Sequence, residues 1–244
     1  MNMLDLTHMF QDGMEDRSLN VILFGETGSG KSSVVNLLAG KEVARTSPDV
    51  GGCTTACQPY PHIVNGVSYS IWDTVGLDEP MGVGTGYLRS IEQVCKLVRD
   101  LTKARGVDLL LFCHRQGRIT TITQKIYTLL YEVACRKSVP IAAVITHLEQ
   151  EERMEDWWDQ NAEIFERRGI KFCGHACVTT LSEDPKMQES REAIERILNT
   201  LDSDGRPRMP AELEVKGKDL VKILRERYGL GEHHAHRVAQ ILAE

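Results

Sequence analysis

The sequence predicts an α/β fold: a six-stranded, doubly wound, mostly parallel sheet with one antiparallel hairpin strand, followed by C-terminal helices. Short apolar runs rich in β-branched residues alternate with amphipathic stretches of helical length, which is typical of a parallel sheet with helices on both faces. Asn65-Gly66 joins two of these runs and favours a tight hairpin turn, so these two strands are expected to be antiparallel. The length of 244 residues suffices for one such domain and a small appendage.

The apolar runs and the amphipathic stretches assign each element in turn. The strands are expected at residues 20–24, 60–65, 67–73, 107–113, 140–146 and 171–178. The helices are expected at residues 31–39, 87–103, 121–136, 153–168 and 185–201. Three of these helices are followed by Gly40, Gly106 and Gly169, because glycine readily adopts the conformation that ends a helix.

Two connections and the two ends of the chain lie outside this alternation. Residues 41–59 and 76–86 form connections longer than compact packing needs, and we interpret them as mobile or functional switch loops. Residues 202–210 are polar and contain two prolines, and apolar residues at helical spacing return after them. We therefore expect an N-terminal extension (1–18), a main domain (19–201) and a C-terminal extension of one or two helices (202–244).

Composition excludes several classes of function. The net charge is −6 and no block of lysine or arginine stands out, so we expect no nucleic-acid partner. The seven cysteines lie at irregular positions and no secretory signal precedes them, which indicates a reducing compartment and a cytoplasmic location. No run approaches the roughly 20 apolar residues of a transmembrane helix.

A phosphate-binding motif directly follows the first strand. The stretch Gly25-Glu26-Thr27-Gly28-Ser29-Gly30-Lys31-Ser32 fits G-x-x-x-x-G-K-[ST] at every fixed position. Its glycines let the backbone amides face the phosphates, the lysine reaches the β- and γ-phosphates, and the last serine ligates Mg²⁺. The chain is therefore expected to bind a nucleoside triphosphate with Mg²⁺ as cofactor. The residues expected to contact the nucleotide here are Gly25, Gly28, Ser29, Gly30, Lys31, Ser32 and Ser33.

The third strand ends in Asp73-Thr74-Val75-Gly76, a D-x-x-G motif. At a strand end some forty residues after the phosphate-binding loop, Asp73 can hold Mg²⁺ through water and the Gly76 amide can meet the γ-phosphate. A threonine between the two motifs is then needed to complete the metal shell. Thr54 and Thr55 are the two candidates.

The fifth strand runs into Thr146-His147-Leu148-Glu149, which we interpret as the base-reading loop. The Glu149 carboxylate can accept hydrogen bonds from the two donors on the guanine edge, which adenine does not present, and the His147 ring can stack on the purine. The residues after the last strand, Thr179 first, would supply a backbone contact to the guanine oxygen. A polar strand-to-helix loop without a ligand is the alternative.

These motifs make the sequence resemble the septin-like GTPases, which include the chloroplast outer-envelope import receptors (Toc) and the immunity-associated GTPases (GIMAP), with fungal G-domain proteins of this type as the suspected nearest group. The resemblance covers residues 19–201 and also rests on the C-T-T-x-C-Q stretch that ends at Gln58 and on D-T-x-G-L at 73–77. It implies a P-loop GTPase (G) domain that binds GTP and GDP. Aligned on Cys57-Gln58, the family's switch threonine falls on Thr54.

Hydrolysis is expected to require a catalytic group from outside the protomer. Leu77 occupies the position after D-x-x-G where many small GTPases carry the glutamine that orients water, so intrinsic turnover should be slow. The resemblance implies GTP-dependent homodimerisation through the nucleotide face, with an arginine supplied in trans. The G-R-I-T stretch at 117–120 makes Arg118 the candidate and Arg115 the second choice, while a solvated arginine before a helix is the alternative.

The expected catalytic set is therefore Lys31, Thr54, Gly76 and Arg118, with Ser32, Thr54 and Asp73 at the metal. Glu26 is an unusual acid so close to phosphates, and we expect it to face water or the other protomer, without an assigned role. Two further functions compete with a GTPase. One is a scaffold that holds GTP and hydrolyses it negligibly, and the other is an ATPase or small-molecule kinase.

Overall fold

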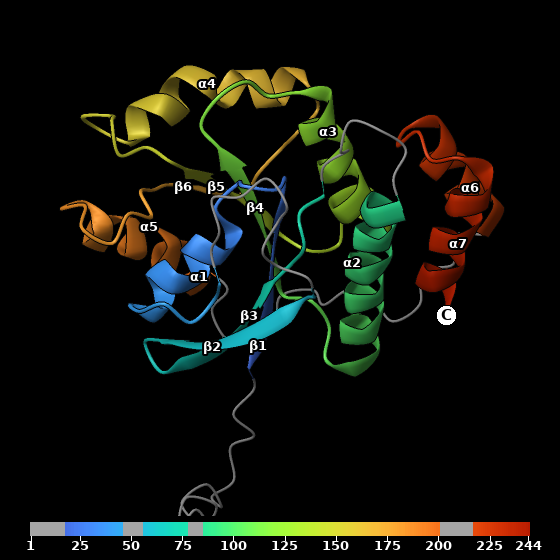
Figure 1. The fold of residues 1–244 in the computed structure, drawn as a ribbon, viewed down its shortest axis with the longest axis horizontal. Helices are drawn as coiled ribbons and strands as arrows, with labels where there is room; N and C mark the ends of the chain where they lie inside the picture. The colour runs from blue at the N-terminus through green and yellow to red at the C-terminus, as the bar shows by residue number, and fades with distance from the viewer. Residues whose placement is uncertain (1–17, 46–55, 78–84, 201–216) are drawn as a thin grey trace, which may run out of the picture.

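A six-stranded sheet organises the computed structural model, which describes residues 18–45, 56–77, 85–200 and 217–244 (Figure 1). Its strand order is β2-β3-β1-β4-β5-β6, with β2 and β3 antiparallel and every other neighbouring pair parallel. The strands are β1 (Leu19–Gly25), β2 (Gln58–Val64), β3 (Val67–Asp73), β4 (Leu109–Arg115), β5 (Ile141–Thr146) and β6 (His175–Cys177). The predicted fold class is confirmed.

Helices cover both faces of this sheet. One apolar core joins α1 and α5 to one face, and a second core joins α2, α3, η1 and α4 to the other. The helices are α1 (Lys31–Ala39), α2 (Thr85–Ala104), α3 (Thr121–Tyr127), η1 (Thr128–Ala134), α4 (Glu155–Arg167), α5 (Met187–Asn199), α6 (Gly217–Glu226) and α7 (Glu232–Ala243). No helix within the described ranges combines the length and apolarity needed to cross a bilayer.

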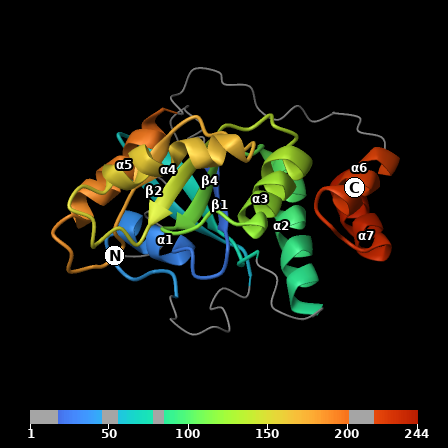
Figure 2. The ribbon, with the colours of Figure 1, turned by 90° about the horizontal axis from the view of Figure 1, so that it is seen from above.

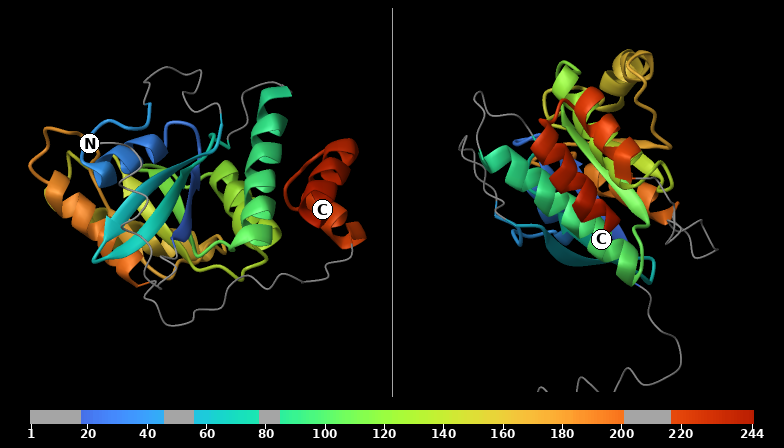
Figure 3. Two further views of the ribbon diagram at one scale, coloured as in Figure 1. Left: turned by 90° about the horizontal axis from the view of Figure 1, so that it is seen from below. Right: turned by 90° about the vertical axis from the view of Figure 1, so that its right-hand side faces the viewer.

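The last two helices form a hairpin on the outer side of α2. In Figure 2, α2 lies between the sheet and the pair α6–α7, and the right-hand view of Figure 3 shows both helices lying in front of α2. Leu224 and Tyr228 are buried in the same core as α2, and the hydroxyl groups of Tyr228 and Tyr87 are 2.8 Å apart. The hairpin therefore extends the core on this side of the sheet.

The hairpin between β2 and β3 turns as its sequence predicts. Asn65 and Gly66 both have positive φ, 50° and 81°, as a two-residue turn of this kind requires. The strand before it begins two residues earlier than expected and includes Pro59 and Pro61. Proline is tolerated there because β2 is an edge strand of the sheet.

Two predicted elements need correction. The strand expected at 171–178 is only His175–Cys177, because the chain at Lys171 is held by Tyr127 instead: its amide donates to the Tyr127 hydroxyl (3.2 Å), and that hydroxyl donates to its carbonyl (3.1 Å). The helix expected at 121–136 is α-helical only in its first half. From Thr128 it continues as the π-helix η1, in which the Cys135 amide donates to the Leu130 carbonyl.

Candidate functional site

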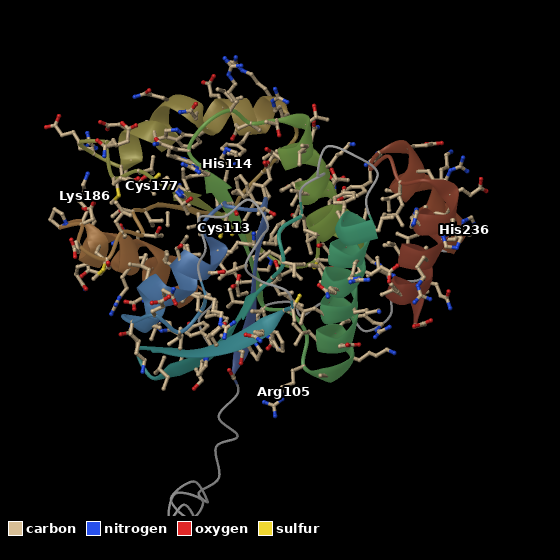
Figure 4. The ribbon with its side chains drawn as sticks, in the orientation of Figure 1. Arg105, Cys113, His114, Cys177, Lys186 and His236 are labelled. Atoms are coloured by element: carbon tan, nitrogen blue, oxygen red, sulfur yellow. The ribbon has the colours of Figure 1, made fainter. Side chains whose placement is uncertain are left out.

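The predicted motifs meet at one edge of the sheet. Parallel strands bring their carboxyl ends together, and ligands of open α/β sheets bind at that edge. Gly25 ends β1 and is paired with Cys113 of β4, while Asp73 of β3 is paired with Leu23. Thr146 ends β5 beside Arg115. Figure 4 labels Cys113 and His114 at this end of β4 and Arg105 at the opposite end of the sheet.

The phosphate-binding loop requires its glycines. Gly25 has φ 154°, and a Cβ there would lie 2.2 Å from the Cys113 carbonyl oxygen, so no side chain fits. Gly28 and Gly30 adopt left-handed φ values of 73° and 85°. Gly30 is the N-cap of α1 and makes no side-chain hydrogen bond to the first turn. The start of this helix therefore presents backbone amides that this residue does not cap. The loop therefore presents main chain, as a phosphate site needs.

Two side chains of the motif, Lys31 and Ser32, have hydrogen-bond partners at this edge of the sheet. Lys31 is buried, and its ammonium group donates to the carbonyls of Glu26 (2.8 Å) and Gly25 (3.3 Å) within the loop. The Ser32 hydroxyl donates to Asp73 Oδ2 at 2.6 Å. A hydroxyl and a carboxylate are hard oxygen ligands of the kind Mg²⁺ prefers, so this pair fits the predicted metal position. Ser33 follows in the first turn of α1.

The residues after Asp73 pack tightly against the phosphate-binding loop. A Cβ on Gly76 would lie 2.1 Å from Thr27 Oγ1, so only glycine allows this approach. The next residue, Leu77, donates its amide to the Gly25 carbonyl (3.1 Å), and its side chain is fully buried. Thr54 and Thr55 lie outside the described residues.

The base loop is fastened to the phosphate-binding loop. The Thr146 hydroxyl donates to the Ser29 carbonyl at 3.0 Å and lies 2.9 Å from His147 Nδ1. His147 takes a left-handed φ of 65° and is half-buried. Burial, with the nearby Arg115 guanidinium, lowers the pKa of its ring, which favours the neutral imidazole for stacking on a base.

Two contacts around Glu149 and Thr179 were not expected from the sequence. The Lys186 ammonium, labelled in Figure 4, donates to the carbonyls of Glu149 (3.2 Å) and Glu151 (2.5 Å) and so steadies the base loop. The Thr179 amide, expected at a guanine oxygen, donates to Ser190 Oγ at 3.0 Å and is buried. No sequence motif signals either contact, because both depend on where α5 begins.

The arginine-bearing loop between β4 and α3 is anchored where it leaves β4. The Gln116 amide donates to the Thr146 carbonyl (3.0 Å), and a buried His114 ring hydrogen-bonds the Gly117 backbone. Arg118 and Arg115 are both exposed, but Arg115 lies beside His147 at the base loop.

Thr120 caps α3 through a reciprocal pair of hydrogen bonds with Thr123. The Thr123 hydroxyl in turn donates to Glu26 Oε1 at 2.8 Å, and Glu26 is half-buried. Glu26 was expected to face water or the other protomer; in the structure the side chain is partly exposed and α3 supplies a partner for one of its carboxylate oxygens.

Comparisons with known proteins agree with this geometry. Among curated proteins, the chain is 25% identical over 191 residues to immune-associated nucleotide-binding protein 7 of Arabidopsis thaliana, covering 75% of this chain and 60% of that protein. It is 30% identical over 107 residues to the translocase of chloroplast 34 homolog of Chlamydomonas reinhardtii, covering 41% and 26% of the two chains. The chain thus spans 60% or less of the length of these relatives.

Solved structures show the same fold. Toc33 from Arabidopsis thaliana matches with a TM-score of 0.61 at 18% identity, over 79% of this chain and 87% of that one. Era from Aquifex aeolicus matches with a TM-score of 0.55 at 18% identity, over 85% and 65%. A family model described as 50S ribosome-binding GTPase matches residues 20–147, just over half of the chain. The resemblance to the import receptors and immunity-associated GTPases is confirmed, and this chain belongs to the 50S ribosome-binding GTPase family.

Proposed function

We propose that this chain binds GTP with Mg²⁺ and hydrolyses it slowly to GDP and phosphate. The observation that carries the proposal is the meeting of three elements at one sheet edge: the phosphate-binding loop, the Ser32–Asp73 pair and the base loop ending in Glu149. Toc33 of the same fold was crystallised with GDP and Mg²⁺ and with Mg²⁺ and GMPPNP, which supports the choice of ligands. Thr54 would complete the metal shell.

Slow hydrolysis follows from the side chains available to an attacking water. Leu77 is turned into the apolar core and carries no polar group. Phosphoryl transfer depends mainly on positioning and charge neutralisation, so a group supplied from outside can raise the rate by roughly 10³ to 10⁵. In this chain Lys31 and the metal would supply part of that charge, and a further cation would supply the remainder.

We infer that a second copy of the chain supplies the remainder through Arg118. Two Toc33 structures support a dimer: one is described as a dimerisation-deficient arginine-to-alanine mutant, and one accompanies the statement that dimerisation is important for the GTPase activity of atToc33 and psToc159. Arg118 is the better candidate than Arg115, since its loop continues into α3, where Thr123 contacts the phosphate-binding loop, whereas Arg115 lies beside the base loop. Both side chains are exposed and accessible to a partner.

The test is GTP turnover per protomer across a wide range of protein concentration, with ATP as the control nucleotide and with molecular size measured in GDP and in GMPPNP. We expect turnover to rise with protein concentration and dimers to form in GMPPNP. Arg118→Ala should keep GTP affinity and abolish that rise. Arg105→Ala is the matched control, because Arg105 is equally exposed but lies at the opposite end of the sheet (Figure 4).

Each alternative function has its own result in the same experiment. A flat, near-zero rate with tight GTP binding would favour the GTP-held scaffold over the trans-activated enzyme. Equal competition by ATP would favour an ATPase or kinase. An Arg118→Ala protein whose turnover still rises with concentration would refute the role of this arginine. The cytoplasmic location and the lack of a nucleic-acid partner remain predictions.

A further inference from the structure

Glu26 connects the phosphate-binding loop to α3, the helix that follows the arginine-bearing loop (residues 116–120). Its carboxylate accepts a hydrogen bond from the Thr123 hydroxyl at 2.8 Å, across nearly a hundred residues of sequence. Thr123 is fully buried, so its hydroxyl depends on partners within the protein. An ionised acceptor makes this a stronger hydrogen bond than one between neutral groups.

The same hydroxyl also holds the end of the loop that carries Arg118. The Thr120 amide donates to Thr123 Oγ1 (3.1 Å), and the Thr123 amide donates back to Thr120 Oγ1 (3.2 Å). Thr120 is only two residues from Arg118. The hydrogen bonds therefore run without a gap from Glu26 through Thr123 to the residue that closes the arginine-bearing loop.

The other end of this loop is held separately. The Gln116 amide donates to the carbonyl of Thr146, whose side chain contacts Ser29 of the phosphate-binding loop. Residues 116–120 are thus connected at both ends to the proposed nucleotide site: through Thr146 of the base loop at one end, and through Thr123 to Glu26 of the phosphate-binding loop at the other. Of these two connections, the one through Glu26 depends on a side chain of the phosphate-binding loop.

We propose that Glu26 is a positioning residue that sets, through Thr123, the place of the loop carrying Arg118 relative to the bound nucleotide. This inference rests on the proposed function, in which Arg118 acts on the nucleotide of a second protomer. A displacement of about 1 Å in such a group can reduce a rate by about 100-fold, so even modest loosening of the loop is measurable. The proposal also accounts for an acidic residue in this motif, since the hydrogen bond from Thr123 directs the Glu26 carboxylate towards α3.

The test uses two variants that break the hydrogen bond and two that keep it. Glu26→Ala and Thr123→Val remove the acceptor and the donor, while Glu26→Gln and Thr123→Ser retain a carbonyl oxygen and a hydroxyl. Each protein, and the double variant Glu26→Ala/Thr123→Val, is measured for GTP affinity, for turnover against protein concentration and for thermal unfolding. Amide hydrogen exchange of Thr120, which retains its own partner in Glu26→Ala, is measured in GDP.

In Glu26→Ala we expect GTP affinity within about twofold of the wild type, a loss of about tenfold in the concentration-dependent part of turnover, and exchange of the Thr120 amide about tenfold faster. Both conservative variants should stay near the wild type. The double variant should lose no more than the larger single loss, because both changes break one connection.

Two results would overturn the inference: unchanged Thr120 exchange in Glu26→Ala, or unchanged concentration-dependent turnover in that variant. If the wild type itself shows a flat rate, the dimer proposal fails. The hydrogen-exchange comparison then still decides whether Glu26 holds the loop, so the two failures are distinguishable. A fall in GTP affinity in Glu26→Ala and Glu26→Gln alike, with normal loop exchange, would instead assign Glu26 to nucleotide binding and refute the positioning role.

Discussion

The pH dependence of stability should reveal the buried histidine at the end of β4. His114 is 6% exposed and is surrounded by the rings of Phe112, Trp157 and Phe165. Burial lowers its pKa from 6.5 to about 4. In the unfolded chain the ring takes up a proton near pH 6.5, whereas the folded protein keeps it neutral down to about pH 4. The stability it contributes is therefore complete above pH 6.5 and is lost as the pH falls towards 4.

The size of this effect follows from the two pKa values. They differ by about 2.5, and each pKa unit corresponds to about 1.4 kcal/mol, so the full loss reaches about 3 kcal/mol at and below pH 4. At pH 5 the unfolded ring is almost fully protonated and the folded ring almost fully neutral. About 2 kcal/mol of the loss should be present there.

The assay is urea unfolding of the wild type and of His114→Phe at pH 7.5 and pH 5. Phenylalanine fills the aromatic cluster and does not titrate, so the variant should not share the loss at low pH. Its free energy of unfolding minus that of the wild type should be about 2 kcal/mol higher at pH 5 than at pH 7.5. His236→Gln is the control, because His236 is exposed (Figure 4). A difference between wild type and His114→Phe that is the same at both pH values would refute the reasoning.

Two further changes test the metal position and the C-terminal hairpin. Asp73→Asn removes the charge next to Ser32, so the gain in GTP affinity on adding Mg²⁺ should fall at least about tenfold in titrations with a fluorescent GTP analogue; an unchanged gain would contradict the assignment. Leu224→Ala empties a fully buried position between α6 and the core and should lower the free energy of unfolding by about 2 to 5 kcal/mol in urea, more than Val221→Ala at a half-buried position.

The sequence predicts the sheet well because each of its signals is local. The apolar run at 20–24 forms β1, Asn65-Gly66 turns the hairpin, and glycine ends α1 at Gly40 with φ 68°. The convergence of Asp73 and Thr146 on the phosphate-binding loop follows from the parallel order of the strands, which these local signals also predict. The positions of Asp73 and Thr146 at strand ends therefore follow from the sequence alone.

The remaining features depend on contacts between distant residues. The apolar spacing within η1 suits an α-helix as well as a π-helix, so the sequence pattern does not distinguish the two. The apolar residues concerned are Leu129, Leu130, Val133 and Ala134. The shortening of the last strand depends on the Tyr127 hydroxyl, 44 residues away. The partner of Glu26 is Thr123, 97 residues away, and no local sequence pattern connects the two.

The two departures from the common motif patterns, Leu77 and Glu26, have one consequence in the folded chain. Both side chains have contacts within the protein: Leu77 is buried in the apolar core, and the Glu26 carboxylate accepts a hydrogen bond from the Thr123 hydroxyl. The Leu77 amide also donates to the Gly25 carbonyl, and Glu26 joins the phosphate-binding loop to α3. Leu77 carries no polar group with which to orient water, so in the proposed mechanism an arginine from a second copy would have a large effect on rate.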